Sequence, residues 1–247
     1  MADLGLGRLH NRRDREGRWR LPRPWHAAER KPVIWVFDAY GTLFDVDGAA
    51  RQAARDDPSL TGIWAALSAD WRRKQLEYSW MRAITGDHAD FWQVTAEALE
   101  WATERHGATA DQSARLLELY RQLPAYPEVP QVLDRLRADG AKTAIFSNGS
   151  PRMLADATAS AGLSGRLDAL LSVESAGRFK PSAEAYGIVT DHFACTPGDI
   201  TFVSSNGWDV YGATRFGFRA VWANRSGLPV DRLPCRPGRI VSDLKGL

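Results

Sequence analysis

An aspartate stands at the end of an apolar run early in this chain, in the segment IWVFDAYGTLFDV (34–46). The run of Ile, Trp, Val and Phe is typical of a buried parallel strand, and Asp38 follows it directly. Because ligands of open α/β sheets bind outside the carboxyl ends of the strands, a carboxylate at this point is placed for chemistry. Asp38 is therefore a candidate nucleophile, and the alternative is an aspartate that only caps the following turn.

Three further polar clusters follow apolar segments later in the chain. SNGS (147–150) comes directly after KTAIF, and its hydroxyl, amide and backbone N–H groups are suited to hold an anion at the start of a helix. Lys180 lies in RFKPSAEAY, and SSNGWD (204–209) follows ITFV. The candidate side chains of these clusters are Ser147, Asn148, Lys180, Ser204, Asn206 and Asp209.

Each cluster has a simpler interpretation when it is taken singly. SNGS is typical of turns, and a lysine before proline is commonly a solvated charge. Together with Asp38 and Thr42 of DAYGT, however, the clusters follow strands whose carboxyl ends meet at one crevice in a doubly wound sheet. This convergence favours an active site, in which the ammonium of Lys180 would keep Asp38 ionised despite the second carboxylate of Asp209.

The elements that must position these groups alternate along the chain. Further strands are predicted at 142–146, 169–173, 200–204 and 219–222, with helices at 129–139, from 148 onward, at 183–192 and at 210–216. This alternation predicts an α/β fold, a Rossmann-like parallel sheet core with helices on both faces. Helical periods over 64–84, 91–106 and 111–123 predict an inserted helical cap. We expect a core of 31–46 and 127–247 and a cap of 47–126.

Residues 1–30 are rich in arginine, contain Pro22 and Pro24, and show no sustained apolar period. We expect a flexible N-terminal extension in solvent. The alternative is a basic arm that touches nucleic acid or acidic lipid, but few residues are available to bind in register. The net charge of +2 on 247 residues also argues against a dedicated nucleic-acid binder.

The cysteine content and the hydropathy of the chain indicate the cellular compartment in which we expect the protein. Cys195 and Cys235 are the two cysteines of the chain, and no CxxC spacing pairs them, so we expect neither a disulfide framework nor a structural zinc site. No apolar stretch approaches the about 18 residues of a membrane span, and the start lacks a hydrophobic signal core. The expectation is a protein of the reducing cytoplasm without a membrane partner.

Five segments resemble those of the (S)-2-haloacid dehalogenases of the haloacid dehalogenase superfamily, namely DAYGTLFDV, WRRKQLEY, SNGS, FKPSAEAY and SSNGWDVYGA. The resemblance covers about residues 33–245. In phosphatases of that superfamily the residue two positions after the nucleophile is a second aspartate that helps to hold magnesium, whereas this chain has Tyr40. A phosphate ester needs a metal to neutralise its charge, but a haloacid carries a neutral carbon–halogen bond. The resemblance therefore implies neither a metal nor an organic cofactor.

The resemblance also implies catalytic roles. Asp38 attacks C2 of the substrate in line, expels halide with inversion and forms an ester that water cleaves. Asp209 is then the base or orients the water, and Ser147 with nearby backbone amides grips the substrate carboxylate. The remaining polar shell implied by the resemblance consists of Thr42, Lys180, Tyr186, Ser204 and Asn206.

Arg72 lies in the predicted cap, and its positive charge suits a departing halide. Leu76, one helical turn later, would add an apolar wall. The alternative is a solvated arginine, because Arg73 and Lys74 adjoin it; the WRxKQLEY match favours function for Arg72, whereas we expect Arg73 to face water. Relatives commonly have glutamine at position 73, which leaves the chain-length preference open.

Further residues match the substrate and halide sites of these enzymes. Asn148 and Trp208 match positions at the halide site, and Tyr40, Leu76 and Phe91 match the apolar substrate pocket. Aromatic residues such as Phe91 and Trp208 are equally suited to core packing.

The resemblance thus implies an enzyme that hydrolyses short (S)-2-haloalkanoic acids to (R)-2-hydroxy acids and halide, and it implies a homodimer. One alternative is a magnesium-dependent phosphatase of the same superfamily, which Tyr40 disfavours. The other is a non-catalytic small-molecule binding protein with this fold, which the joint presence of Asp38, Lys180 and Asp209 disfavours.

Overall fold

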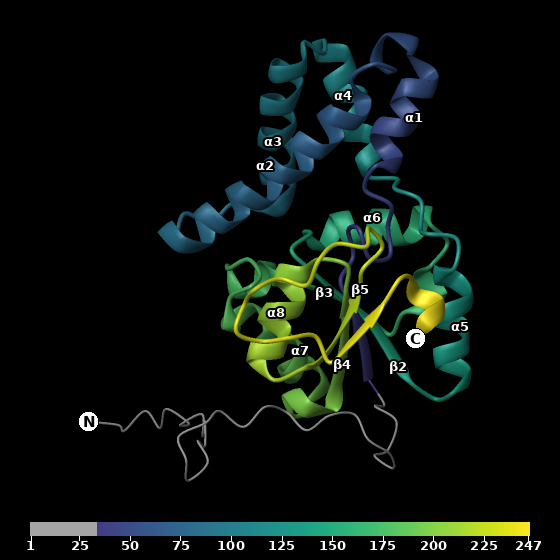
Figure 1. Ribbon diagram of the computed structural model, residues 1–247, viewed down its shortest axis with the longest axis vertical. Helices are drawn as coiled ribbons and strands as arrows, with labels where there is room; N and C mark the ends of the chain where they lie inside the picture. The colour runs from purple at the N-terminus through teal and green to yellow at the C-terminus, as the bar shows by residue number, and fades with distance from the viewer. Residues whose placement is uncertain (1–33) are drawn as a thin grey trace. The chain divides into compact units, whose positions relative to one another are not determined.

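The computed structural model describes residues 34–247, and its elements alternate as the sequence predicts (Figure 1). They form a Rossmann-like parallel sheet with helices on both faces and an inserted helical cap. The predicted flexible extension, residues 1–30, lies outside the described residues.

The sheet has six strands, and every neighbouring pair is parallel. The spatial order is β3 (Ala169–Ser172), β2 (Lys142–Ser147), β1 (Ile34–Phe37), β4 (Ile200–Ser204), β5 (Arg219–Ala223) and β6 (Arg239–Val241). The chain adds strands to one side of β1 and later to the other, so the order reverses at β1. A ligand crevice forms at such a reversal.

Strand register brings the predicted clusters to that crevice. Phe37 of β1 lies opposite Ile145 of β2 and Val203 of β4. The backbone N–H of Asp38 donates to the carbonyl of Val203 at 2.9 Å and so continues the pairing by one residue. Asp38 and Ser204 therefore end adjacent strands at the same edge of the sheet.

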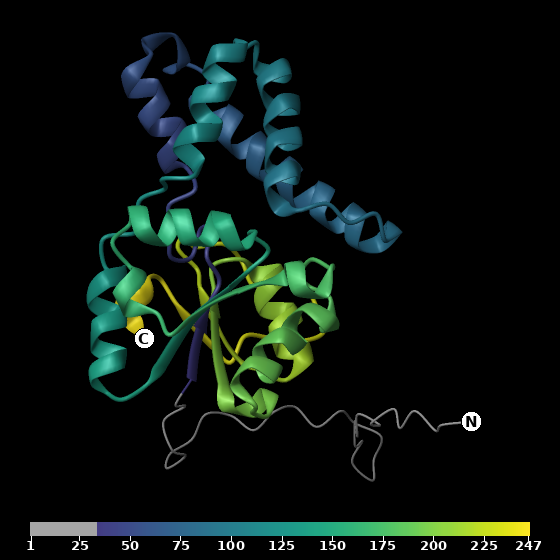
Figure 2. The ribbon, with the colours of Figure 1, turned by 180° about the vertical axis from the view of Figure 1, so that it is seen from behind.

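Four longer helices belong to the core. Their bounds are α5 (Val129–Ala138), α6 (Pro151–Ser160), α7 (Ala183–Phe193) and α8 (Gly207–Phe216). Helix α5 lies on one side of the sheet and helices α7 and α8 lie on the other in both views (Figures 1 and 2). The prediction that the last helix begins at residue 210 was wrong, because the N–H groups of Asp209 and Val210 already donate to the carbonyl of Asn206.

Four helices form the insertion between β1 and α5. They are α1 (Gly48–Asp56), α2 (Trp64–Thr85), α3 (Phe91–His106) and α4 (Ala110–Tyr120). Helices α2 and α3 run side by side (Figure 2). Gly86, at φ 77°, ends α2, and the side chain of Asp90 caps α3 by accepting from Gln93 N–H. The cap limits of 47–126 stay a prediction.

Helix α1 was not predicted from the sequence. It buries Ala49, Ala50 and Ala53, and such small side chains produce a weak apolar period. The two cysteines are free thiols. Across residues 34–247, none of the helices combines the length and the apolar character that a bilayer crossing requires.

Candidate active site

Asp38 is buried at the end of β1, and its carboxylate is surrounded by hydrogen-bond donors. Oδ1 accepts from Lys180 Nζ at 2.9 Å. Oδ2 accepts from the Thr42 hydroxyl and from Asn206 Nδ2, each at 2.9 Å, and from the Ser204 hydroxyl at 3.3 Å. These donors hold the carboxylate in one orientation, as attack by a carboxylate oxygen requires.

Lys180 lies between two carboxylates with only 1% of its side chain exposed. Its Nζ donates to Asp38 at 2.9 Å, to Asp209 Oδ2 at 2.7 Å and to the Phe146 carbonyl at 3.2 Å. Burial alone would lower the pKa of this ammonium, but the charges of Asp209 and Asp38 outweigh burial and leave the pKa above its usual value. Lys180 is therefore charged at neutral pH, and all three of its donors are used.

Asp209 is the second carboxylate of the site and lies in the first turn of α8. Its Oδ1 accepts from the Tyr186 hydroxyl at 2.6 Å, and its Oδ2 accepts from Lys180. Burial raises the pKa of Asp209 above its ordinary value, although the Lys180 charge and the Tyr186 hydrogen bond oppose this rise. A carboxyl with a raised pKa beside a nucleophile is suited to act as a general base.

The SNGS segment links β2 to α6 beside these groups. The Gly149 N–H donates to the Ser147 hydroxyl at 3.1 Å, and Asn148 Oδ1 accepts from the Lys180 backbone N–H at 2.9 Å. A Cβ atom at Gly149 would lie 2.9 Å from Cε2 of Tyr40, so only glycine allows this close approach. Asn148 therefore contacts Lys180 directly, and Ser147 precedes it at the end of β2.

Arg72 reaches the core from helix α2 of the cap. Its Nη1 donates to Gln75 Oε1 at 2.9 Å, and its Nη2 donates to the Tyr40 carbonyl at 3.3 Å and to Asn206 Oδ1 at 3.4 Å. Asn206 therefore contacts Asp38 through Nδ2 and Arg72 through Oδ1. All three acceptors of Arg72 are neutral, so its positive charge is available to an anion.

Three aromatic residues that the sequence assigned to the substrate and halide sites pack against other rings. The ring of Tyr40 is buried, stacks on Tyr120 with centroids 5.4 Å apart, and lies 6.4 Å from the ring of Phe91. Trp208 packs edge to face on Trp80 of α2 at 5.5 Å. Tyr40, Phe91 and Trp208 thus all pack against aromatic rings, which leaves the packing interpretation of Phe91 and Trp208 open beside a role in the pocket.

Leu76 and Arg73 follow Arg72 on α2 and differ in exposure. Leu76 is half-buried. The side chain of Arg73 is 51% exposed and pairs with Asp70 at 2.9 Å and with Glu77 at 3.2 Å. Its guanidinium also lies over the ring of Trp101. These contacts agree with the expectation that Arg73 faces water.

Comparisons with known proteins place this arrangement in a family. A sequence model of the haloacid dehalogenase-like hydrolases matches residues 34–217. The (S)-2-haloacid dehalogenase 1 of Pseudomonas sp. (strain CBS-3) is 44% identical over 198 residues, which is 79% of this chain and 86% of the relative.

The chain belongs to the haloacid dehalogenase-like hydrolases, in the (S)-2-haloacid dehalogenase family.

A further relative in sequence and a solved structure agree with this assignment. The (S)-2-haloacid dehalogenase of Xanthobacter autotrophicus is 45% identical over 74% of this chain and 71% of that protein. A solved structure of an L-2-haloacid dehalogenase from Xanthobacter autotrophicus with chloropropionic acid covalently bound superposes with a TM-score of 0.76. It is 37% identical and covers 87% of this chain and 96% of that one. The predicted resemblance is confirmed.

Several contacts of this family member were not predicted from its sequence. Arg225, in the loop after β5, donates to the Thr42 carbonyl at 2.9 Å and pairs with the buried carboxylate of Glu128 at 2.7 Å. The backbone N–H of Ser205 donates to the Thr42 hydroxyl at 2.8 Å. Gln75 lies in the segment WRRKQLEY, but no role was predicted for it. Its position three residues after Arg72, on the same face of a helix, could have indicated the contact.

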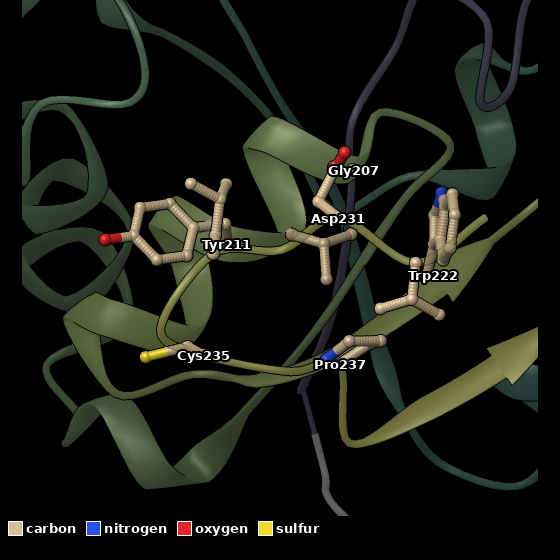
Figure 3. Close-up of a pocket in the computed structure, with 9 residues that line it drawn as sticks. Gly207, Tyr211, Trp222, Asp231, Cys235 and Pro237 are labelled. Carbon is tan, nitrogen blue, oxygen red and sulfur yellow. The ribbon is translucent and has the colours of Figure 1, made fainter. Parts of the chain in front are cut away.

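A mainly apolar pocket lies beside the start of α8 (Figure 3). It is lined by Gly207, Val210, Tyr211, Trp222, Val230, Asp231, Leu233, Cys235 and Pro237. Asp38, Lys180 and Asp209 do not line it. In this dehalogenase-like hydrolase the pocket is therefore distinct from the carboxylate site, although Trp222 connects the two by donating to the Ser205 carbonyl at 3.0 Å.

Proposed function

We propose that this enzyme hydrolyses short (S)-2-haloalkanoic acids to (R)-2-hydroxy acids and halide through an ester on Asp38. The observation that carries the proposal is the position of the Asp38 carboxylate. It is buried, oriented by Lys180 on one oxygen and by hydroxyl and amide donors on the other, and connected through Asn206 to the guanidinium of Arg72. This arrangement joins a nucleophile to a cation suited to a leaving halide.

In the first step, a carboxylate oxygen of Asp38 forms a bond to C2 as the carbon–halogen bond breaks, and the electron pair leaves with the halide. Arg72 faces the leaving atom with its positive charge, and Asn148 and Trp208 complete the halide site. Ser147 and the backbone N–H groups of its segment hold the substrate carboxylate. Inversion at C2 follows from attack opposite to the leaving atom.

In the second step, Asp209 takes a proton from water, and the water oxygen adds to the ester carbonyl carbon of Asp38. The bond between that carbon and the substrate oxygen then breaks, and the proton returns to the departing hydroxyl. Tyr186 and Lys180 orient the base through its two oxygens. The hydroxyl oxygen of the product thus comes from the enzyme carboxylate, and solvent oxygen replaces it.

The surroundings of Tyr40 distinguish this chemistry from phosphoryl transfer. A superfamily phosphatase needs a carboxylate at this position, whereas here a buried phenol packs between aromatic rings, and burial raises the pKa of Tyr40 well above its usual value. A neutral phenol does not replace an acidic ligand. We infer that the enzyme needs neither a metal nor an organic cofactor.

The remaining parts of the proposal concern partners and location. We infer a small haloacid as the partner, with no nucleic acid or membrane partner, and a homodimer in the cytoplasm. Family membership supports the haloacid, the cysteine content supports the cytoplasm, and the homodimer rests on the resemblance of the sequence motifs alone. Sedimentation of the purified protein tests the dimer, and a monomer across micromolar concentrations would contradict it.

The substrate class is tested by halide release from (S)- and (R)-2-chloropropionate in the presence of EDTA. We expect halide from the (S) isomer alone. Hydrolysis of p-nitrophenyl phosphate with magnesium is measured beside it. Phosphatase activity without halide release would identify the superfamily alternative, and ligand binding without any turnover would identify the binding-protein alternative.

The ester is tested by one turnover in ¹⁸O-water, with enzyme in excess over (S)-2-chloropropionate. Lactate from this turnover should carry no label at its hydroxyl, and the peptide that contains Asp38 should gain the label. Labelled lactate with an unlabelled Asp38 peptide would show that water attacks C2 directly.

A further inference from the structure

Gln75 is a buried amide on helix α2, three residues after Arg72, with 1% of its surface exposed. Its Oε1 accepts from Arg72 Nη1 at 2.9 Å. The other acceptors of Arg72, at 3.3 and 3.4 Å, are more distant. The Gln75 bond is therefore the shortest hydrogen bond that orients the guanidinium.

A chain of hydrogen bonds fixes the orientation of this amide. The Thr95 hydroxyl donates its proton to the Phe91 carbonyl at 2.6 Å, so it can only accept from Gln75. Gln75 Nε2 donates to it at 2.7 Å and also lies 3.2 Å from the Tyr120 hydroxyl. With Nε2 committed to Thr95, Oε1 must face Arg72. Helix α3 thus orients Arg72 through Gln75.

The neutrality of Gln75 matters as much as its position. A carboxylate at this point would orient the guanidinium equally well but would neutralise its charge. A small cavity adjoins the same groups and is lined by Val46, Ser68, Trp71, Arg72, Gln75 and Tyr120. Its volume admits about one water molecule, so packing does not hold the guanidinium tightly on this side.

We propose that Gln75 is a positioning residue that holds Arg72 toward the leaving halide without reducing its charge. This inference rests on the proposed function. Because chloride is a poorer leaving group than bromide, bond cleavage with chloride depends more on the oriented cation. Gln75 therefore lowers the ratio of the bromide rate constant to the chloride rate constant.

The test compares single-turnover rate constants for (S)-2-chloropropionate and (S)-2-bromopropionate. Gln75→Leu should lower the chloride rate constant about 100-fold, within the range for loss of one oriented donor, and the bromide rate constant by less. The bromide-to-chloride ratio should rise about threefold or more, with little change in KM. Gln75→Glu retains the size and the acceptor but adds a charge, and should raise the ratio as well.

Ser79→Ala is the matched control, because Ser79 is buried on the same helix and its hydroxyl donates to the Leu76 carbonyl at 2.7 Å. It should leave the ratio unchanged. A ratio of the wild-type value in both Gln75 variants would overturn the proposal whatever the overall rate, since a packing defect lowers both rates alike. If Gln75→Leu does not fold, the bromide-to-chloride ratio of Gln75→Glu tests the proposal.

A second readout does not depend on turnover. A crystal structure of Gln75→Leu, or of Gln75→Met if that variant does not fold, should show the Arg72 guanidinium displaced, whereas Gln75→Glu, which retains the acceptor, should keep it in place. A guanidinium that stays within hydrogen-bond distance of Asn206 and the Tyr40 carbonyl in Gln75→Leu would contradict the proposal. If the wild-type enzyme releases no halide, the proposed function fails, and this structure still shows whether Gln75 orients Arg72.

Discussion

The core and the cap position their charged groups by different means. In the core, Asp38 and Ser204 end adjacent strands, so backbone register sets their separation. In the cap, Arg72 projects from a helix, and its shortest hydrogen bond goes to the side chain of Gln75. Many backbone hydrogen bonds fix the strand register together, whereas the position of a side chain such as Arg72 depends on a few rotamers.

The charges also differ between the two regions. The core pairs one lysine with two carboxylates, and all three are buried. Within residues 34–247, the hydrogen-bond acceptors of Arg72 in the cap are neutral oxygens. In the proposed mechanism, the core provides the nucleophile and the base that every substrate needs, and the cap provides a cation for the leaving atom. Substitutions of Asp38, Lys180 or Asp209 in the core should affect all substrates alike, and those of Arg72 in the cap should depend on the halogen.

The largest effect is expected for Asp38→Asn in the core. A neutral amide is a poor nucleophile, so turnover should fall at least about 10⁴-fold for chloride and bromide substrates alike. Halide release and intact-protein mass spectrometry measure turnover and ester formation. An ester on the variant, or a loss that depends on the halogen, would contradict the assignment of Asp38.

Lys180→Met should impair both activity and stability. Asp38 and Asp209 would then share a buried site without a cation, so we expect a loss of about 3–5 kcal/mol in the free energy of unfolding. Urea unfolding at pH 7 measures it, and the double variant Lys180→Met/Asp209→Asn should recover part of this loss but no activity. Wild-type stability in the single variant would show that the lysine does not compensate the two carboxylates.

Arg72→Ala should lower turnover about 10²–10³-fold and more for chloride than for bromide substrates, because it removes the cation that faces the leaving atom. Arg72→Lys should restore little, since an ammonium lacks the planar array of donors. Circular dichroism should show an intact fold. Near-normal turnover by Arg72→Ala would remove this residue from the site, and a loss equal for both halogens would break the contrast between cap and core.

Tyr186→Phe should change the pH dependence of the second step. The Tyr186 hydroxyl stabilises the ionised form of Asp209, so its loss raises the pKa of Asp209 further. The base is active when ionised, so activity is present above this pKa and is lost as the pH falls through it. The acid limb of kcat should therefore move to higher pH, with about a tenfold loss at neutral pH. If the acid limb of the kcat profile does not move, the titration that it reports belongs to a group other than Asp209.

Deletion of residues 1–28 should have the smallest effect. The segment precedes β1 and lacks an apolar period, so neither the core nor the cap is expected to need it. We expect kcat/KM for (S)-2-chloropropionate to stay within a factor of about three. A larger loss in steady-state kinetics would indicate that the segment covers the site or contributes to a dimer contact.

Much of the secondary structure could be predicted from local patterns. Strand β4 and helix α3 have the predicted bounds, because a short apolar run and a long helical period are strong signals. Strand β6 and helix α1 were missed. The three residues of β6 are largely exposed, and the buried face of α1 consists of alanines, so neither produces a contrast between apolar and polar positions.

The sequence by itself determined which polar groups end which strands. Asp38, Ser147 and Ser204 each follow or close an apolar run, and a parallel sheet brings such ends to one edge. These conclusions depend on the order of residues over short stretches, where periodicity is informative.

Only the tertiary structure decided how the side chains pair. It placed Lys180 between Asp38 and Asp209, Asn206 between Asp38 and Arg72, and the Arg225 guanidinium on the Thr42 carbonyl. These partners are mostly far apart in the chain, and their distances follow from strand register, helix packing and rotamers. A local sequence pattern encodes neither strand register, nor helix packing, nor rotamers, because each of these arises from the simultaneous packing of several elements.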